Sequence, residues 1–164
     1  MIEQLITRSV RELSVGFYDD AQIESALRFM FGVDSRLIDD GTYHVVEAEG
    51  TLAAAGGWSR RRTLFGGDRW KREADDALDP SREPARIRAF FVHPAWPRRG
   101  LGRLLFETCR RAAKAEGFQR LELMATLPGE PLYRALGFTA DERVELELPD
   151  GVLMPLVRMS RAIE

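Results

Sequence analysis

The first half of the chain predicts two helices followed by two strands. Apolar residues recur at helical spacing over 2–13, and a second helix follows Asp19 or Asp20, either of which can cap its first turn. Residues 43–49 and 51–58 predict two strands that meet at Gly50 and form a hairpin. Two adjacent glycines, Gly56 and Gly57, indicate a bulge or a close backbone approach in the second strand.

The second half predicts strands and helices in alternation. A strand at 87–92 precedes an amphipathic helix at about 100–116, which Gly117 ends. A buried strand at 121–125 and a short helix at 128–136 follow, and Pro149-Asp150-Gly151 predicts a hairpin between strands at 144–148 and 152–159. This order predicts an α/β fold whose sheet has mixed strand direction.

The segment 59–84 lacks a clear period, starts basic and becomes acidic. A structureless loop of this length is unusual inside a compact domain. We interpret it as a solvated excursion between two strands. The alternatives that give the segment a function are a lid over a substrate or a contact between two copies of the chain.

Composition narrows the class of protein. With 164 residues, the chain favours one domain, and its net charge of -2 gives no reason to expect nucleic acid as a partner. The single cysteine, Cys109, excludes an intrachain disulfide and a multi-cysteine zinc site, which fits a reducing cytoplasm. No apolar run is long enough to span a bilayer, and the first residues lack the pattern of a signal peptide. We therefore expect a cytoplasmic protein without membrane, nucleic-acid or metal partners.

A candidate anion site follows the strand at 87–92. The turn Arg98-Arg99-Gly100-Leu101-Gly102 opens a helix, and a helix N-terminus has unpaired N–H groups and partial positive charge. The turn lacks the third glycine of a dinucleotide fingerprint and the Gly-Lys-Ser/Thr ending of a P-loop, so the glycines alone are a weak signal. The two arginines favour a phosphate ligand over a plain solvated loop.

Tyr133 is the candidate catalytic side chain. It either packs its ring on the sheet or supplies a phenol hydroxyl as a proton donor. Because a phenol has a high pKa, it stays protonated at neutral pH and can protonate a thiolate leaving group.

Three motifs stand in this order along the chain: Phe90-x-Val92-His93-Pro94, Arg98-Arg99-Gly100-Leu101-Gly102 and Tyr133-x-x-x-Gly137-Phe138. Together they resemble the GCN5-related N-acetyltransferase (GNAT) superfamily. The resemblance covers residues 87–138 closely and reaches the chain end through the last hairpin. It implies one domain over 1–164 with a mostly antiparallel sheet, flanking helices and a cleft where the central strand splays from its neighbour. The family's usual first strand would precede the first helix, and three alternatives stay open: the strand is absent, the chain is a shortened version, or the N-terminal segment is misassigned. A sheet edge left exposed would need cover, for which a homodimer is a candidate.

The resemblance implies that acetyl-coenzyme A enters this cleft as the acyl donor. Its pantetheine amides would pair with strand backbone, its pyrophosphate would bind the helix N-terminus, and an N–H near Phe91 would polarise the thioester carbonyl. Tyr133 matches the position that often protonates the departing thiolate. The implied cofactor-binding residues are Phe90, Phe91, Val92, Arg98, Arg99, Gly100, Leu101, Gly102, Arg103 and Leu104.

The implied reaction is direct attack of a primary amine on the acetyl group, without a covalent enzyme intermediate. The acceptor is a small-molecule or peptide amine that the sequence does not name. The alternative is a non-catalytic module that binds acyl-coenzyme A as a sensor, because Arg86 and Arg88 occupy the region where many family members have a catalytic glutamate. A different nucleotide-binding protein is disfavoured by the incomplete phosphate motifs.

The sequence departs from the family turn at Pro97, which stands where Gln or Arg is usual and has no N–H to donate. The general base is open. Glu47, Glu49 and Glu122 are each better explained as solvated or salt-bridged carboxylates, and a water chain is an alternative base.

Histidine, cysteine and aromatic side chains are further candidates for a role in the site. We interpret His93 as part of a turn and Cys109 as a core residue, and His44 has no visible partner. Aromatic residues could line the acceptor pocket, although sheet packing is the expected role for Trp58. These aromatic candidates are Tyr43, Trp58, Phe65 and Trp70.

Overall fold

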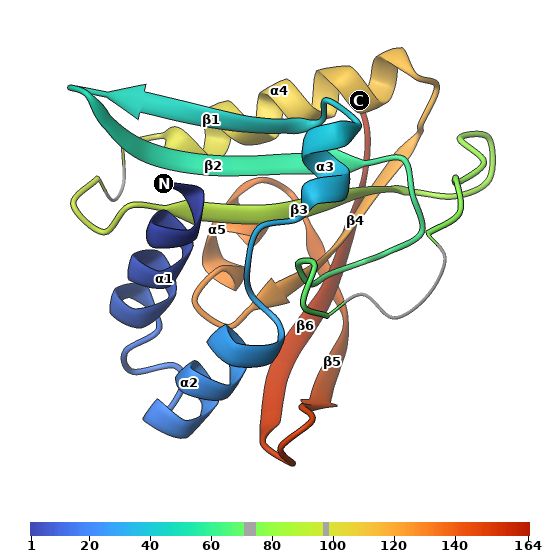
Figure 1. Ribbon diagram of the computed structural model, residues 1–164. Coiled ribbons are helices and arrows are strands. Elements are labelled where there is room, and N and C mark those ends of the chain that lie inside the picture. The colour runs from blue at the N-terminus through green and yellow to red at the C-terminus, as the bar shows by residue number, and fades with distance from the viewer. Residues whose placement is uncertain (71–74, 97–98) are drawn as a thin grey trace.

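The computed structural model describes residues 1–70, 75–96 and 99–164, and in this part of the chain six strands form one sheet in the order β1-β2-β3-β4-β6-β5. Strands β3 and β4 are parallel and the other neighbours are antiparallel, which confirms the predicted mixed sheet (Figure 1). The strands are β1 (Tyr43–Ala48), β2 (Thr51–Ser59), β3 (Ala85–Val92), β4 (Arg120–Thr126), β5 (Thr139–Glu147) and β6 (Leu153–Ala162).

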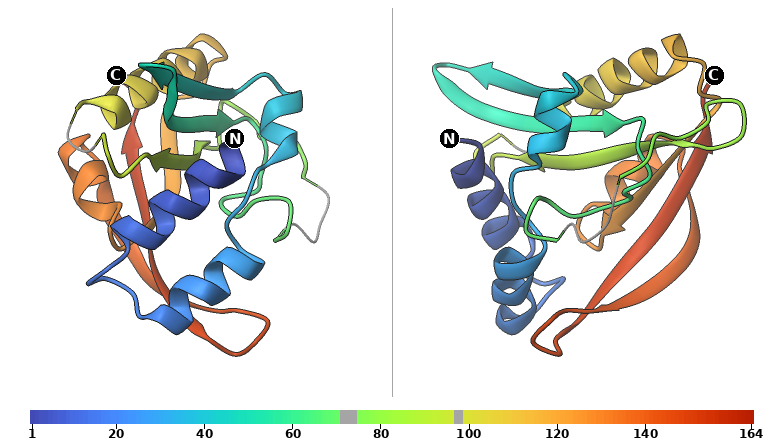
Figure 2. Two further views of the ribbon diagram at one scale, coloured as in Figure 1. Left: turned by 60° about the vertical axis from the view of Figure 1, so that its left-hand side comes forward. Right: turned by 45° about the vertical axis from the view of Figure 1, so that its right-hand side comes forward.

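Helices cover both faces of the sheet (Figures 1 and 2). On one face, α1 (Ile2–Leu13) and α2 (Asp20–Phe29) pack against the sheet, and on the other α4 (Leu101–Ala115) and α5 (Glu130–Ala135) do so. The predicted cap of α2 is present, because the Asp19 carboxylate accepts a hydrogen bond from the Gln22 N–H at 2.8 Å. A further short helix, α3 (Ser35–Asp39), was not predicted.

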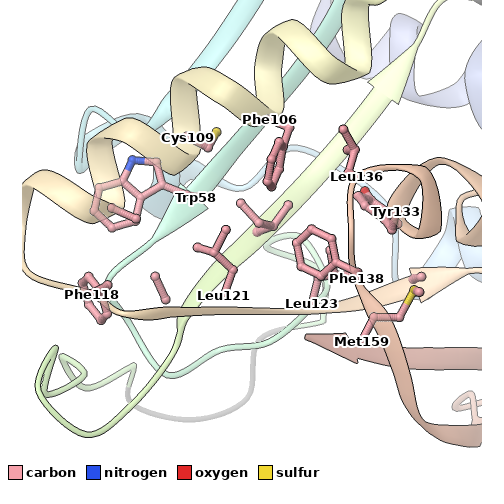
Figure 3. Close-up of a cluster of buried hydrophobic side chains, with 14 of the residues drawn as sticks. Trp58, Phe106, Cys109, Phe118, Leu121, Leu123, Tyr133, Leu136, Phe138 and Met159 are labelled. Carbon is pink, nitrogen blue, oxygen red and sulfur yellow. The ribbon is translucent and has the colours of Figure 1, made fainter. Parts of the chain in front are cut away.

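Large aromatic side chains fill the core between the sheet and α4 (Figure 3). Trp58 is only 1% exposed and meets the edge of Phe118 with ring centroids 6.1 Å apart. Phe106 on α4 packs in the same way against Phe138, at 5.7 Å. Such edge-to-face pairs add to the stabilisation that burial of the rings already gives. Trp58 is therefore a core residue, as the sequence predicted.

A bulge interrupts the pairing of β2 with β3, where the sequence predicted one. The register passes from Ala55 opposite Phe91 to Gly57 opposite Arg88, so two residues of β3 face Gly56 alone. A Cβ atom on Gly56 would lie 2.4 Å from the ring of Phe90, and only glycine leaves that ring its space. The bulge turns Phe90 toward the α4 core and Phe91 toward the core beneath α1 and α2.

The described part of the long loop after β2 folds back on itself. Arg62 donates its backbone N–H to Asp76 at 2.9 Å, and Leu78 donates to Arg60 at 2.8 Å. Leu78 is buried in the core beneath α4, so this end of the loop contributes to packing as well as facing solvent.

The described elements begin with α1, and β1 stands at one edge of the sheet with β2 as its neighbour. None of the helices in the described residues combines the length and apolar character needed to cross a membrane.

Candidate active site

The site begins where β3 and β4 separate. In the described residues, two pairs join these strands, Ala85 with Leu121 and Arg86 with Glu122, and beyond them the strands diverge (Figure 1). A cavity of about 230 Å³ occupies the gap, lined by β3 from Ile87 to Val92. This is the splay that the family resemblance implied.

The cavity connects the two faces of the sheet. From the α5 face it is lined by Gly129, Leu132 and Tyr133, and from the α1 face by residues that include Val10 and Met30. Two molecules that approach from opposite faces can therefore meet inside it. This arrangement suits a direct transfer between two substrates.

Tyr133 lines the cavity from α5 and lies beside Phe138 at the edge of the aromatic core (Figure 3). Its ring also contacts that of Phe90, with centroids 6.2 Å apart. Burial raises the pKa of Tyr133 above its ordinary value, and the nearby Cys109 adds to the increase. The hydroxyl is thus held protonated at neutral pH, as a proton donor must be.

Strand β3 presents backbone to the cavity. Phe91 and Val92 pair with Ala55 and Ala54 of β2, and their other side faces the gap left by β4. The three predicted residues, Phe90, Phe91 and Val92, all line the cavity. An extended ligand can bind such a strand edge through backbone hydrogen bonds.

The predicted anion site lies at the start of α4. Gly100 has a φ of +75°, a conformation that favours glycine, and its carbonyl accepts the first helical hydrogen bond from Leu104 at 2.9 Å. The N–H groups of Leu101, Gly102 and Arg103 precede that bond and so have no partner within the helix. Pro97 and Arg98 lie outside the described residues.

Two arginines of the predicted site are exposed at this helix start. The guanidinium group of Arg99 lies 5.2 Å from the centre of the Trp96 ring, and Arg103 lies in the first turn of α4. Leu104 is also exposed, at 53%. The guanidinium groups of Arg99 and Arg103 are therefore accessible to a ligand in solvent.

Gly102 has a packing role that the sequence did not indicate. A Cβ atom here would lie 2.8 Å from a methyl carbon of Leu132, so the absence of a side chain lets α4 approach α5 closely. The glycine thus brings the helix N-terminus next to the helix that carries Tyr133.

Comparison with known proteins identifies the family. The family model described as "Acetyltransferase (GNAT) family" matches residues 6–138, which is most of the chain. The chain belongs to the GNAT acetyltransferase family. No curated protein matches it.

Solved structures share the fold of this GNAT acetyltransferase at low sequence identity. A GCN5-related N-acetyltransferase from Rhodopseudomonas palustris superposes with a TM-score of 0.70 at 16% identity, and the match covers 98% of this chain and 87% of the Rhodopseudomonas chain. The PaiA N-acetyltransferase from Thermoplasma acidophilum, solved in complex with coenzyme A, gives 0.63 at 13% identity, covering 98% and 90%. YncA from Salmonella typhimurium, solved with its cofactor acetyl-CoA, gives 0.58 at 17% identity, covering 96% and 86%.

Among the described residues that line the cavity of this acetyltransferase, the charged one is Arg88, which is 3% exposed. One of its terminal nitrogens lies 2.8 Å from the Asp34 carboxylate and donates to the Gly66 carbonyl at 2.6 Å, and the other donates to Thr63 at 3.2 Å. Burial lowers the pKa of Arg88, and the Asp34 carboxylate opposes that change. The arginine therefore ties β3 to the long loop and to the start of α3. An arginine inside the apolar stretch 87–92 was the sequence signal for this anchor, but its partner was not predicted.

The carboxylates weighed as a general base in this GNAT protein do not line the cavity. Glu122 lies 3.5 Å from Arg86 and 3.8 Å from Arg158, which fits the salt-bridged role predicted for it. Glu47 and Glu49 are exposed at the β1–β2 hairpin. The polar side chains that do line the cavity include Ser9, Ser14 and Thr126.

His93 and Cys109 have structural roles. The Nδ1 atom of His93 accepts a hydrogen bond from the Ala95 N–H at 3.0 Å, which fixes the turn after β3. Cys109 is fully buried on α4, and burial raises the pKa of its thiol to about 12. A thiol with such a pKa is a poor nucleophile at neutral pH.

The aromatic candidates for the acceptor pocket have different roles in the structure. Phe65 lines the cavity, and its ring packs on Trp70 at 5.7 Å. The Tyr43 hydroxyl instead donates to the Ala89 carbonyl at 3.0 Å and so holds the bulge of β3. Among residues 1–70, 75–96 and 99–164, no cluster of three potential metal ligands occurs.

Proposed function

We propose that this acetyltransferase moves an acetyl group from acetyl-coenzyme A to a primary amine by direct attack. The observation that carries the proposal is the cavity through the sheet, with Tyr133 on one side and the backbone of β3 along it. The family membership supports the acyl donor, and the free N–H groups at the start of α4 suit its pyrophosphate.

In this reaction the protein has to position the two substrates and to donate one proton. Backbone groups of Phe90 to Val92 would hold the pantetheine arm, and an N–H near Phe91 would stabilise the negative charge that develops on the thioester oxygen. As the amine nitrogen bonds to the acetyl carbon, the carbon–sulfur bond breaks and the electron pair goes to sulfur. Tyr133 donates a proton to that sulfur, and the proton lost by the amine leaves through water.

Amine-dependent release of free thiol from acetyl-coenzyme A tests this function. With a panel of primary amines and a chromogenic thiol reagent, we expect at least one amine to raise the release rate about tenfold or more above buffer alone. A tertiary amine, which has no N–H to lose, is the matched control and should leave the rate at its background value. Acetyl-coenzyme A that binds in calorimetry without any amine-dependent release would favour a sensor over an enzyme.

Arg103→Glu tests the cradle at the start of α4. Because the change places a negative charge beside the proposed pyrophosphate site, we expect the Kd for acetyl-coenzyme A in calorimetry to rise about tenfold. The increase should shrink as salt is added. Arg111→Glu changes the net charge equally about 12 Å further along the same helix and should leave the Kd nearly unchanged. Equal losses in the two variants would contradict the cradle.

A further inference from the structure

The half of the cavity on the α1 face is lined by apolar side chains from three segments. They come from α1, from the end of α2 and from the long loop after β2, and Phe31 also meets Phe91 edge to face at 5.9 Å. We name this set the apolar half of the cavity. It consists of Val10, Leu13, Met30, Phe31 and Phe65.

The apolar half of the cavity is the part in which the acceptor would bind. The proposed cradle at the start of α4 and the proton donor Tyr133 both lie on the opposite face of the sheet. If the acyl donor enters from that face, the amine must reach the thioester from the face of α1 and α2 (Figure 2).

The apolar half offers little to a second charge on the acceptor. Among the described residues that line the cavity, none is a carboxylate, and Ser9 and Ser14 contribute neutral hydroxyl groups. Arg88 is the cation there, but its guanidinium group already contacts Asp34 and two backbone carbonyls. A charged group that enters this space would lose its hydration without gaining an ionic partner, which is unfavourable.

The apolar character continues from the cavity to the surface. Leu13, at the end of α1, lines the cavity and is 38% exposed. In the turn that follows, Val15 and Phe17 are 72% and 49% exposed, which is unusual for large apolar side chains so close together. An apolar body held in the cavity can therefore extend over this turn.

We propose that the acceptor is a primary amine on an apolar body, of the alkylamine or arylalkylamine class, with no second charged group. The inference rests on the proposed function and deepens it. Polyamines would place a second ammonium group in the apolar half, and free amino acids would place a carboxylate there. Both classes should be poor acceptors.

Two matched pairs of amines test the inference. Pentylamine and 1,4-diaminobutane have the same number of heavy atoms, and 2-phenylethylamine differs from phenylalanine by one carboxylate. We expect kcat/KM from thiol release to favour the singly charged member of each pair by about tenfold or more. Preference for the diamine or the amino acid would overturn the inference and leave the function intact. Absence of release with every primary amine tested would instead overturn the proposed function, and this inference with it.

Leu13→Asp places a carboxylate at the mouth of the apolar half, on a half-exposed position that tolerates a polar side chain. We expect the ratio of kcat/KM for 1,4-diaminobutane to that for pentylamine to rise about tenfold, because the new carboxylate can pair with the second ammonium group. Leu13→Asn has the same shape without the charge and should leave the ratio close to that of the wild type. An unchanged ratio in Leu13→Asp would show that the acceptor does not bind in the apolar half.

Discussion

Replacing Tyr133 by phenylalanine is expected to lower kcat about a hundredfold while the Kd for acetyl-coenzyme A changes little. A general acid commonly contributes at least that factor, and phenylalanine keeps the ring contacts with Phe90 and Phe138. The thiolate would then leave without a proton donor at hand. Steady-state kinetics with a saturating amine, together with calorimetry of the acyl donor, measure both quantities.

Tyr18→Phe is the matched control for this change. Tyr18 is also buried, but its hydroxyl donates to the Pro155 carbonyl at 2.7 Å and accepts from the Leu127 N–H at 2.9 Å, and it does not line the cavity. Its loss should lower Tm because two buried backbone groups lose their partner, while kcat of the folded enzyme stays within about twofold. A kcat for Tyr133→Phe equal to that of the wild type would remove Tyr133 as the acid.

The pH profile gives a second readout of the same residue. Because burial raises the pKa of Tyr133, the hydroxyl stays protonated through the range where an ordinary tyrosine, with a pKa of about 10, begins to ionise. We therefore expect kcat of the wild type to show no loss up to about pH 10. Folding stability should fall as the pH rises from about 10 toward the folded-state pKa, because the unfolded state releases this proton more readily than the folded state.

Arg88→Met is expected to lower the free energy of unfolding by about 3 kcal/mol, as measured by urea denaturation. The change removes the buried partner of Asp34 and the hydrogen bonds to Thr63 and Gly66. Because Gly66 lines the cavity, kcat/KM for the acceptor should fall as well.

Two further variants distinguish the effect of losing the ion pair from that of a general loss of packing. Adding Asp34→Asn to Arg88→Met removes the buried charge but keeps an oxygen that can accept from the Arg36 N–H, so stability should partly recover. Arg86→Met, two residues away on β3, removes a more exposed ion pair with Glu122 at 3.5 Å and should cost only about 1 kcal/mol. Equal losses for Arg86→Met and Arg88→Met would contradict the anchoring role of Arg88.

Most of the secondary structure followed from local pattern. The apolar spacing of 2–13 predicted α1 with the bounds that the structure has, Asp19 was one of two predicted caps of α2, and Gly56-Gly57 predicted a bulge or a close backbone approach. The sequence missed α3, because five residues are too few to show a helical period. It also placed the start of β5 five residues late, since Thr139 to Arg143 lie on an edge strand and are largely exposed.

The sequence by itself determined the family, the order of the elements and the two stretches that carry the candidate chemistry. Glycines, caps and apolar spacing act over a few residues, and so they can be recognised without a structure. The turn before α4 and Tyr133 on α5 are features of this kind.

Only the tertiary structure decided how these stretches form a site. The bulge at Ala89, with a φ of +56°, places Ile87 and Phe90 in the same core although they are three residues apart, which simple strand alternation does not predict. The pairing of Arg88 with Asp34 joins residues 54 positions apart, and Gly102 leaves room for a methyl group of Leu132 on another helix. Such contacts depend on distances between elements that only packing in three dimensions sets, and they determine the cavity in which the reaction is proposed to occur.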